Sequence, residues 1–325
     1  MSPQDVKRVL SSLEGGAAFA LQTPWGNEVL GRAGRWALPM QAYRVALLLH
    51  AHVPLVKGTM NGIEYPWGAL SDEILKCGGS CQHNLDPALL HCGSCNVDAT
   101  QSQVHDAIRD LLYLFSLEAK QRAGKEVATG LEFSNGFAYY LKDADVWLAV
   151  GPDQLPLALD VKTYVSSGDT LDGRTGLDVF LSSALRWKFE NAKFNDHVRI
   201  AKERNAANGH SFTPFLSDWY GGLHPSARDH LNWLAQTNST CGHWQGSASR
   251  LYASYCRRLS VVTAVAYANM VASKITKVTH PTLLNNDQDE HPTRHFDFIP
   301  PASVSAHLAS FIYPHGLPPG LPISP

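Results

Sequence analysis

The sequence predicts an α/β protein in which a mixed central sheet is flanked by helices. Three observations support this fold class: an amphipathic helix pattern, a series of short strand-like runs after it, and then a second helical stretch with a further strand. This order is typical of a sheet with helices on its faces. The predicted elements are a helix over 104–119, strands over 126–133, 137–141, 145–150 and 157–164, a helix over 178–205 and a strand over 210–217.

The first helix is predicted from apolar residues at helical spacing, among them Val104, Ile108 and Phe115. Asp98 is a suitable residue to cap its start, and Gly124 is a suitable residue to end it. We therefore expect one long helix to precede the strands.

The strands are predicted from alternation and from a turn signal. Ser-Asn-Gly at 134–136 separates two strand-like runs and predicts a hairpin. In 157–164 the apolar residues at every second position share one face, so Asp160 and Lys162 share the other, ~6.6 Å apart along the strand.

Helices are predicted on both sides of this core. Residues 1–76 are expected to form a helical lead-in, since 36–50 is apolar and the Val53-Pro54 pair would end a helix there. Residues 225–235 and 248–273 also have a helical pattern. The predicted organisation is a lead-in over 1–76, a zinc knuckle over 77–98, a core over 99–240, a helical region over 241–313 and an irregular, proline-rich tail over 314–325.

Composition excludes several classes of protein. Hydrophobic residues make up 44% of the 325 and charged residues 17%, which argues against wholesale disorder. A formal net charge of −2 excludes a bulk polycation, so a nucleic-acid contact would need a local basic strip. The apolar run over 259–273 is shorter than the ~20 residues of a membrane span, and residues 1–13 lack the apolar core of a signal peptide. We expect a soluble, intracellular protein without a membrane partner.

Four cysteines lie in two close pairs, Cys77 with Cys81 and Cys92 with Cys95. Such spacing in a large intracellular chain favours a metal over disulfides, and four thiolates suit tetrahedral Zn²⁺. His83 or His91 is an alternative for one of the cysteines. With four protein ligands the zinc would be structural. The competing interpretation is a set of free thiols or an adventitious disulfide.

Carboxylates and a lysine gather on the predicted strands. Asp160 and Lys162 share a face, Asp145 can join them if its strand pairs with theirs in a hairpin, and Glu132 can add a further carboxylate. Converging carboxylates are ligands for Mg²⁺, which activates water and neutralises phosphate, and a lysine can stabilise charge on phosphorus. The alternative is an ordinary ion pair on an exposed sheet face.

These motifs together resemble a known family. The motifs are the Cys/His knuckle, the helix with His105-Asp106-Ala107-Ile108-Arg109-Asp110, the Glu132 strand, and the strands with Ala144-Asp145 and Asp160-Val161-Lys162. Their order resembles the restriction-like endonuclease region of non-LTR retrotransposon polyproteins, which belongs to the PD-(D/E)XK superfamily. The resemblance covers about 36–235. Ala144 replaces the family's proline, Gln103 replaces a basic residue, and Ala88 stands near an expected histidine of the knuckle.

The resemblance implies a metal-dependent DNA endonuclease with Mg²⁺ or Mn²⁺ at Asp145 and Asp160, assisted by Lys162 and Glu132, and a nuclear location if the chain derives from a retroelement. His105 and Arg109 would contact phosphate or the active site, the alternative being a structural hydrogen bond to the knuckle. Lys188 and Lys193 fall where the family carries a basic residue in the following helix. Rival functions are a catalytically inactive nucleic-acid-binding module and a protein-interaction domain of the same fold.

A basic strip is the candidate for DNA contact. Residues 183–204 hold six basic and three acidic residues, a net charge of +3, with Trp187 and Phe194 between them. Such a strip can lie on a phosphate backbone, although a solvated amphipathic helix would look the same. Arg250, Arg257 and Arg258 form a weaker second strip. No pattern predicts a base-reading helix, a target sequence or an oligomeric state.

Overall fold

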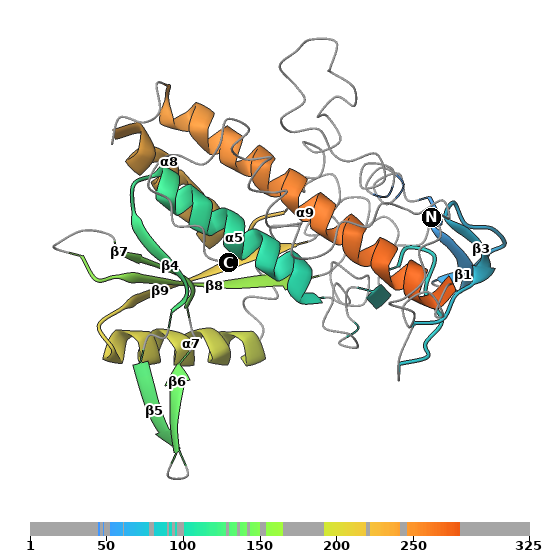
Figure 1. Cartoon of the computed structure of the whole chain (residues 1–325), viewed down its shortest axis with the longest axis horizontal. Helices are drawn as coiled ribbons and strands as arrows, with labels where there is room; N and C mark the ends of the chain where they lie inside the picture. Colours follow the sequence, from blue (N-terminus) through green and yellow to red (C-terminus); the bar gives the residue numbers. More distant parts are fainter. Residues whose placement is uncertain are drawn as a thin grey trace, which may run out of the picture.

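The computed structural model is a mixed α/β structure (Figure 1). It describes residues 45, 48, 53–60, 62–77, 81–89, 91–92, 95, 101–127, 130–134, 137–141, 144–149, 154–164, 192–218, 222–240 and 246–279. The described elements are β1 (Val56–Met60), β2 (Ile63–Tyr65), β3 (Ser71–Ile74), α5 (Gln101–Glu118), β4 (Arg122–Val127), β5 (Gly130–Ser134), β6 (Phe137–Leu141), β7 (Ala144–Ala149), β8 (Leu157–Tyr164), α7 (Ala192–Ala207), β9 (Ser211–Asp218), α8 (Pro225–Thr240) and α9 (Ala248–Thr279).

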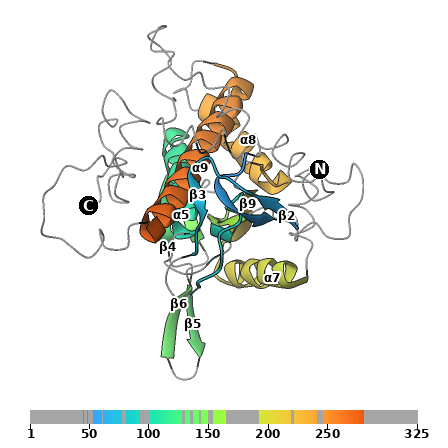
Figure 2. The same ribbon diagram turned by 90° about the vertical axis from the view of Figure 1, so that its right-hand side faces the viewer.

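The main sheet has four strands in the order β4-β7-β8-β9. The pairs β4–β7 and β7–β8 are antiparallel and β8–β9 is parallel, so the predicted mixed sheet is confirmed. Helices α5, α8 and α9 lie on one face and α7 lies on the other (Figures 1 and 2). The two faces bury different strand residues: Leu159 and Val161 face α5, whereas Ala158 and Phe212 pack with α7.

The strands β7, β8 and β9 confirm the strands predicted over 145–150, 157–164 and 210–217. The helices α8 and α9 confirm the predictions over 225–235 and 248–273. Helix α7 confirms the helix predicted over 178–205 from residue 192 onward, and 178–191 lies outside the described residues.

Helix α5 buries the predicted stripe, with Val104, Ile108 and Phe115 each 0% exposed. The prediction that Gly124 ends this helix is wrong. The helix stops at Glu118 because Lys120 adopts a left-handed conformation with φ of 55°, the backbone state that commonly closes a helix. Gly124 instead pairs with Trp147 inside β4.

The strand predicted over 126–133 is two elements, because Glu126 has a φ of 48° near the end of β4 and β5 begins at Gly130. Strands β5 and β6 form a separate two-stranded antiparallel sheet with Ser134 opposite Phe137, which confirms the predicted hairpin. This hairpin projects from the main sheet past α7 (Figure 1). Glu132 therefore pairs with Tyr139 in the hairpin and is not on a strand of the main sheet.

The C-terminal part of the predicted helical lead-in is a sheet, so that part of the prediction is wrong. Strands β1, β2 and β3 form the order β2-β1-β3. Burial in β1 alternates, as a half-buried strand requires, and not with a helical period. A side chain on Gly68 would lie 2.4 Å from Cα of Val56, so this close approach needs glycine. Of 1–52, only residues 45 and 48 are described.

One continuous core joins the small sheet, the cysteine-rich segment, the main sheet and the helices α5, α8 and α9. Its centre includes Phe115 and Tyr255, whose rings stack with centroids 4.1 Å apart. Arg258, expected in a weak DNA-binding strip, is instead buried against Phe115 and bonded to Glu118. Among the described helices, none has the combination of length and apolarity that a bilayer crossing requires.

Candidate functional site

A Cys3His cluster is the strongest candidate metal centre. The ligand atoms of Cys77, Cys81, His91 and Cys95 all lie within 4.8 Å of one another. Sγ of Cys77 is 3.6 Å from Sγ of Cys95, and Sγ of Cys81 is 3.1 Å from Nε2 of His91. Ligands around tetrahedral Zn²⁺ at ordinary bond lengths are about 3.5–3.8 Å apart, whereas a disulfide is about 2.05 Å long. The cluster can bind zinc.

Two short backbone structures hold these ligands. The first carries Cys77 and Cys81 and is closed by a bridge between Lys76 and Asn84 and by a 2.7 Å hydrogen bond from Cys77 N–H to the carbonyl of His83. These bonds hold together the two segments that carry Cys77 and Cys81.

The second structure carries His91 and Cys95. The Asp86 carboxylate accepts the N–H groups of Ala88 and His91, at 3.1 and 2.8 Å, and so caps the turn. Cys95 N–H donates to the carbonyl of His91 at 2.9 Å, which is helical spacing and places both side chains on one side.

The ligand set differs from the cysteine set favoured by the sequence at one position. His91, weighed as an alternative, joins the cluster, whereas Cys92 is 0% exposed in the hydrophobic core. The physical reason is the helical turn: residue 91 shares a side with Cys95 and residue 92 does not. His83, the other alternative, is exposed and lies beside the His91 ring with centroids 5.5 Å apart.

Three residues of the predicted carboxylate cluster, Asp145, Asp160 and Lys162, lie toward one end of the β7–β8 pair. These strands are antiparallel, and their paired region has Val146 opposite Leu159, so Asp145 and Asp160 are the next residues at the same end of the two strands. Oδ2 of Asp145 accepts the Val161 N–H at 2.6 Å, and Nζ of Lys162 is 3.1 Å from Oδ1 of Asp160. Asp160 is 8% exposed. Lys162 therefore pairs with Asp160, and its positive charge also acts on Asp145.

The cluster lacks a described third metal ligand. Of the described residues, no set of three His, Cys, Asp or Glu side chains that includes Asp145 or Asp160 comes within mutual metal-binding distance. The side chain of Glu132 lies outside the described part of the chain, and its backbone belongs to the β5–β6 hairpin.

His105 extends this cluster from α5. Its Nε2 is 3.2 Å from Oδ2 of Asp145 and its Nδ1 is 3.1 Å from Oδ1 of Asp106. Burial alone would lower the pKa of His105, but the hydrogen bonds and negative charges of Asp106 and Asp145 raise it to about 9. The pKa of the Asp145 carboxyl is lowered. Burial alone would raise this pKa, but the hydrogen bonds from His105 and the Val161 N–H, together with the positive charges of His105 and Lys162, outweigh the effect of burial. At neutral pH the pair is therefore imidazolium and carboxylate.

The His105–Asp145 pair is expected to make the free energy of unfolding depend on pH. A histidine with a raised pKa in the folded protein contributes stability that is complete below its ordinary value near 6.5 and is lost as the pH rises through about 9. Between pH 6.5 and about pH 10, we expect the free energy of unfolding of the wild-type protein to fall. This fall is expected to exceed that of His105→Gln by on the order of 2 kcal/mol. Urea unfolding at several pH values measures this difference. Parallel pH profiles for the two proteins would contradict it.

Arg109 is enclosed by carboxylates. Its guanidinium bonds Asp106 and Asp110, each at 3.0 Å, and also Glu126 on β4, and its side chain is 13% exposed. This network fastens α5 to β4, and the expected contact of Arg109 with nucleic acid stays a prediction.

The predicted basic strip is described only from residue 192. Arg199 on α7 is paired with Glu203 at 2.9 Å and with Asp196 at 3.7 Å, which is the arrangement of a solvated helix surface. Lys188 and the side chain of Lys193 lie outside the described residues. Their role in DNA contact stays a prediction.

No protein-family model matches the chain, and no curated protein sequence matches it significantly. Function is therefore inferred from the sites themselves.

Proposed function

We propose that the chain is a metal-dependent DNA endonuclease of the restriction-like type, a phosphodiester hydrolase derived from a retroelement. The observation that supports it most is the ion pair of Asp160 with Lys162 on β8, with Asp145 on the adjacent strand β7 and within range of the Lys162 charge. A buried carboxylate beside a second carboxylate and an ammonium is costly to a fold and is typical of functional sites.

The donor set fits a hard divalent cation. Asp145 and Asp160 supply carboxylate oxygens, which Mg²⁺ and Mn²⁺ prefer, and Glu132 is the proposed further ligand. A bound ion would supply Lewis-acid activation of water and neutralisation of phosphate. Lys162, whose side chain is 39% exposed, is available to a phosphodiester at the end of the sheet and stabilises negative charge there.

The Cys3His cluster has a structural role in this proposal. Its four protein ligands leave no open position for substrate. It lies a few residues before α5, the helix that carries His105 to Asp145, and shares its core. Zinc would hold that helix in place against the sheet.

Plasmid cleavage tests the proposal. Wild-type protein is expected to nick or linearise DNA with Mg²⁺ or Mn²⁺ and not with EDTA, and Asp160→Asn or Lys162→Met is expected to lose about 100-fold or more of the rate, because each removes a group at the reacting phosphate. Asp196→Asn on exposed α7 is the matched control and is expected to retain activity. If the wild-type protein and both site variants leave the plasmid equally intact, the proposal of a nuclease is refuted.

A second function is favoured by one specific observation. Oδ2 of Asp145 already accepts both His105 and the Val161 N–H, and a charged imidazole competes with a cation for that oxygen. This favours an inactive nucleic-acid-binding module. Such a module would bind DNA without cleaving it, with affinity falling steeply from about 50 to 200 mM salt. A protein-interaction domain would show no such salt-dependent binding.

A further inference from the structure

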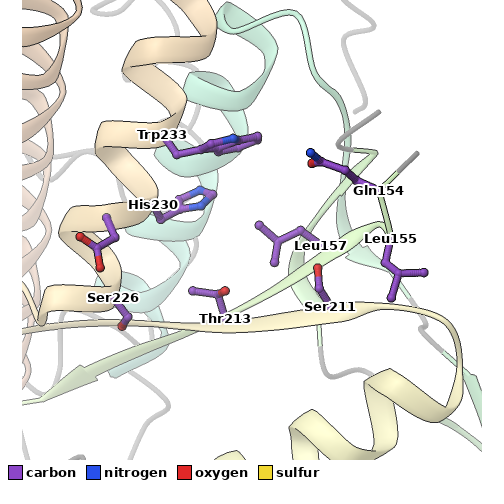
Figure 3. Close-up of a pocket in the computed structure, with 9 residues that line it drawn as sticks. Gln154, Leu155, Leu157, Ser211, Thr213, Ser226, His230 and Trp233 are labelled. Carbon is purple, nitrogen blue, oxygen red and sulfur yellow. The ribbon is translucent and has the colours of Figure 1, made fainter. Parts of the chain in front are cut away.

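A second concave site lies on the face of the main sheet that α8 covers. It has a volume of about 630 Å³ and lies between α8 and the starts of β8 and β9 (Figure 3). Leu157 and Thr213 line it, and each alternates with a residue that faces α7, Ala158 and Phe212 respectively. None of the described lining residues belongs to the carboxylate cluster, so the pocket and that cluster are separate sites.

One wall of the pocket is aromatic. The rings of His230 and Trp233 on α8 are tilted by 33° with centroids 5.6 Å apart, and Phe215 supports His230 edge-on from β9. Leu157 faces this wall from β8, and Leu155, which is 57% exposed, extends the apolar lining toward the opening (Figure 3). An aromatic wall facing an apolar side chain suits a flat ligand.

The polar groups of the pocket are few and almost uncharged. His230 is 5% exposed, and its Nε2 has no hydrogen-bond partner. Burial lowers the pKa of His230 to about 3, so at neutral pH this ring is uncharged and can both donate and accept. Ser211 and Thr213 add hydroxyls from β9. Of the nine described lining residues, only Asp229 carries a formal charge at neutral pH, and it is exposed.

We propose that this pocket binds an uncharged, planar heteroaromatic ring of the nucleobase type, up to the size of a purine nucleoside. The volume is in the range of small-molecule sites, and an indole beside an imidazole is a stacking surface for a base. Hydroxyls and a neutral histidine match the mixed donors and acceptors on a base edge. Because no lysine or arginine is among the described lining residues, a phosphate would stay outside. This inference does not rest on the proposed nuclease activity.

Adenosine is the probe for the test, and calorimetry or saturation-transfer NMR on the full chain measures its binding. Trp233→Leu is expected to weaken adenosine binding at least about tenfold, and Thr213→Val several-fold at unchanged volume. Trp67→Leu, which changes a 52% exposed tryptophan near β3, is the control and is expected to have no effect. Thr213→Val keeps the test valid if Trp233→Leu does not fold.

Two further ligands identify what the pocket accepts. A single strand of eight deoxyadenosines that displaces adenosine would show that the pocket takes bases of a strand, and failure to displace it would assign the pocket to the free nucleoside. Argininamide binding more tightly than adenosine, and lost in Trp233→Leu, would overturn the proposal in favour of a cation. Absence of adenosine binding at millimolar concentration, or identical binding in both pocket variants, would also overturn it. The Asp160→Asn protein is expected to bind adenosine normally, so failure of the nuclease and failure of the pocket are distinguishable.

Discussion

Purified protein is expected to contain about one zinc per chain, and Cys77→Ser or His91→Gln is expected to reduce this to a small residual fraction. Each change removes one of the four clustered ligands. The melting temperature is expected to fall by about 10 °C or more, because the lost metal-binding free energy is folding free energy. Metal analysis and thermal unfolding, with and without a chelator, measure the two effects.

Two matched controls test the ligand set. His83→Gln changes an exposed histidine next to His91, and Cys92→Ala changes a buried cysteine next to it, so both proteins are expected to keep their zinc. Cys92→Ala is expected to lower stability through lost packing alone. Zinc retained by His91→Gln and lost by Cys92→Ala would reinstate the four-cysteine site and contradict the structure.

Glu118→Ala is expected to destabilise the protein by about 3 kcal/mol or more. Both carboxylate oxygens of Glu118 accept the guanidinium of Arg258, at 2.6 and 2.7 Å, and the Arg258 side chain is 7% exposed. Removal of one partner leaves a buried charge uncompensated, which costs more than the pair itself contributes. Urea unfolding at neutral pH measures this loss.

The double variant Glu118→Leu with Arg258→Met separates the cost of an uncompensated buried charge from the loss of the ion pair itself. It replaces the pair by apolar groups and is expected to be less destabilised than Glu118→Ala. Arg199→Ala is the surface control: its pair with Glu203 is exposed, and the change is expected to cost less than about 1 kcal/mol. A similar loss in Glu118→Ala and Arg199→Ala would contradict the importance of the buried pair.

The central part of the fold could be predicted because its residues carry periodic patterns. Leu157, Leu159 and Val161 alternate along one strand, and Val104, Ile108 and Phe115 follow one helix face. The end of α5 could not be predicted, because Lys120 takes a left-handed conformation that its residue type does not favour. The β1–β3 sheet was missed because its short strands depend on pairing between distant residues and on the close approach at Gly68.

The candidate sites were predictable to different extents. Cysteine spacing located the metal cluster, but only the local turn decides between His91 and Cys92. The pairing of the strands that carry Asp145 and Asp160 follows from their alternating patterns and places both residues at the same end of the β7–β8 pair. The aromatic pocket was not foreseen, because His230 and Trp233 acquire meaning only when α8 packs beside β9.

The continuous core has a consequence for any attempt to express parts of this chain. Helix α9, the cysteine-rich segment and the main sheet all contribute to the core that contains α5, and Tyr255 of α9 stacks directly on Phe115 of α5. A recombinant fragment confined to 99–240 would expose Phe115 and leave Glu118 without Arg258. Such a truncation would aggregate or unfold even though it retained Asp145, Asp160 and Lys162, so a negative cleavage assay on it would not test the proposed nuclease activity.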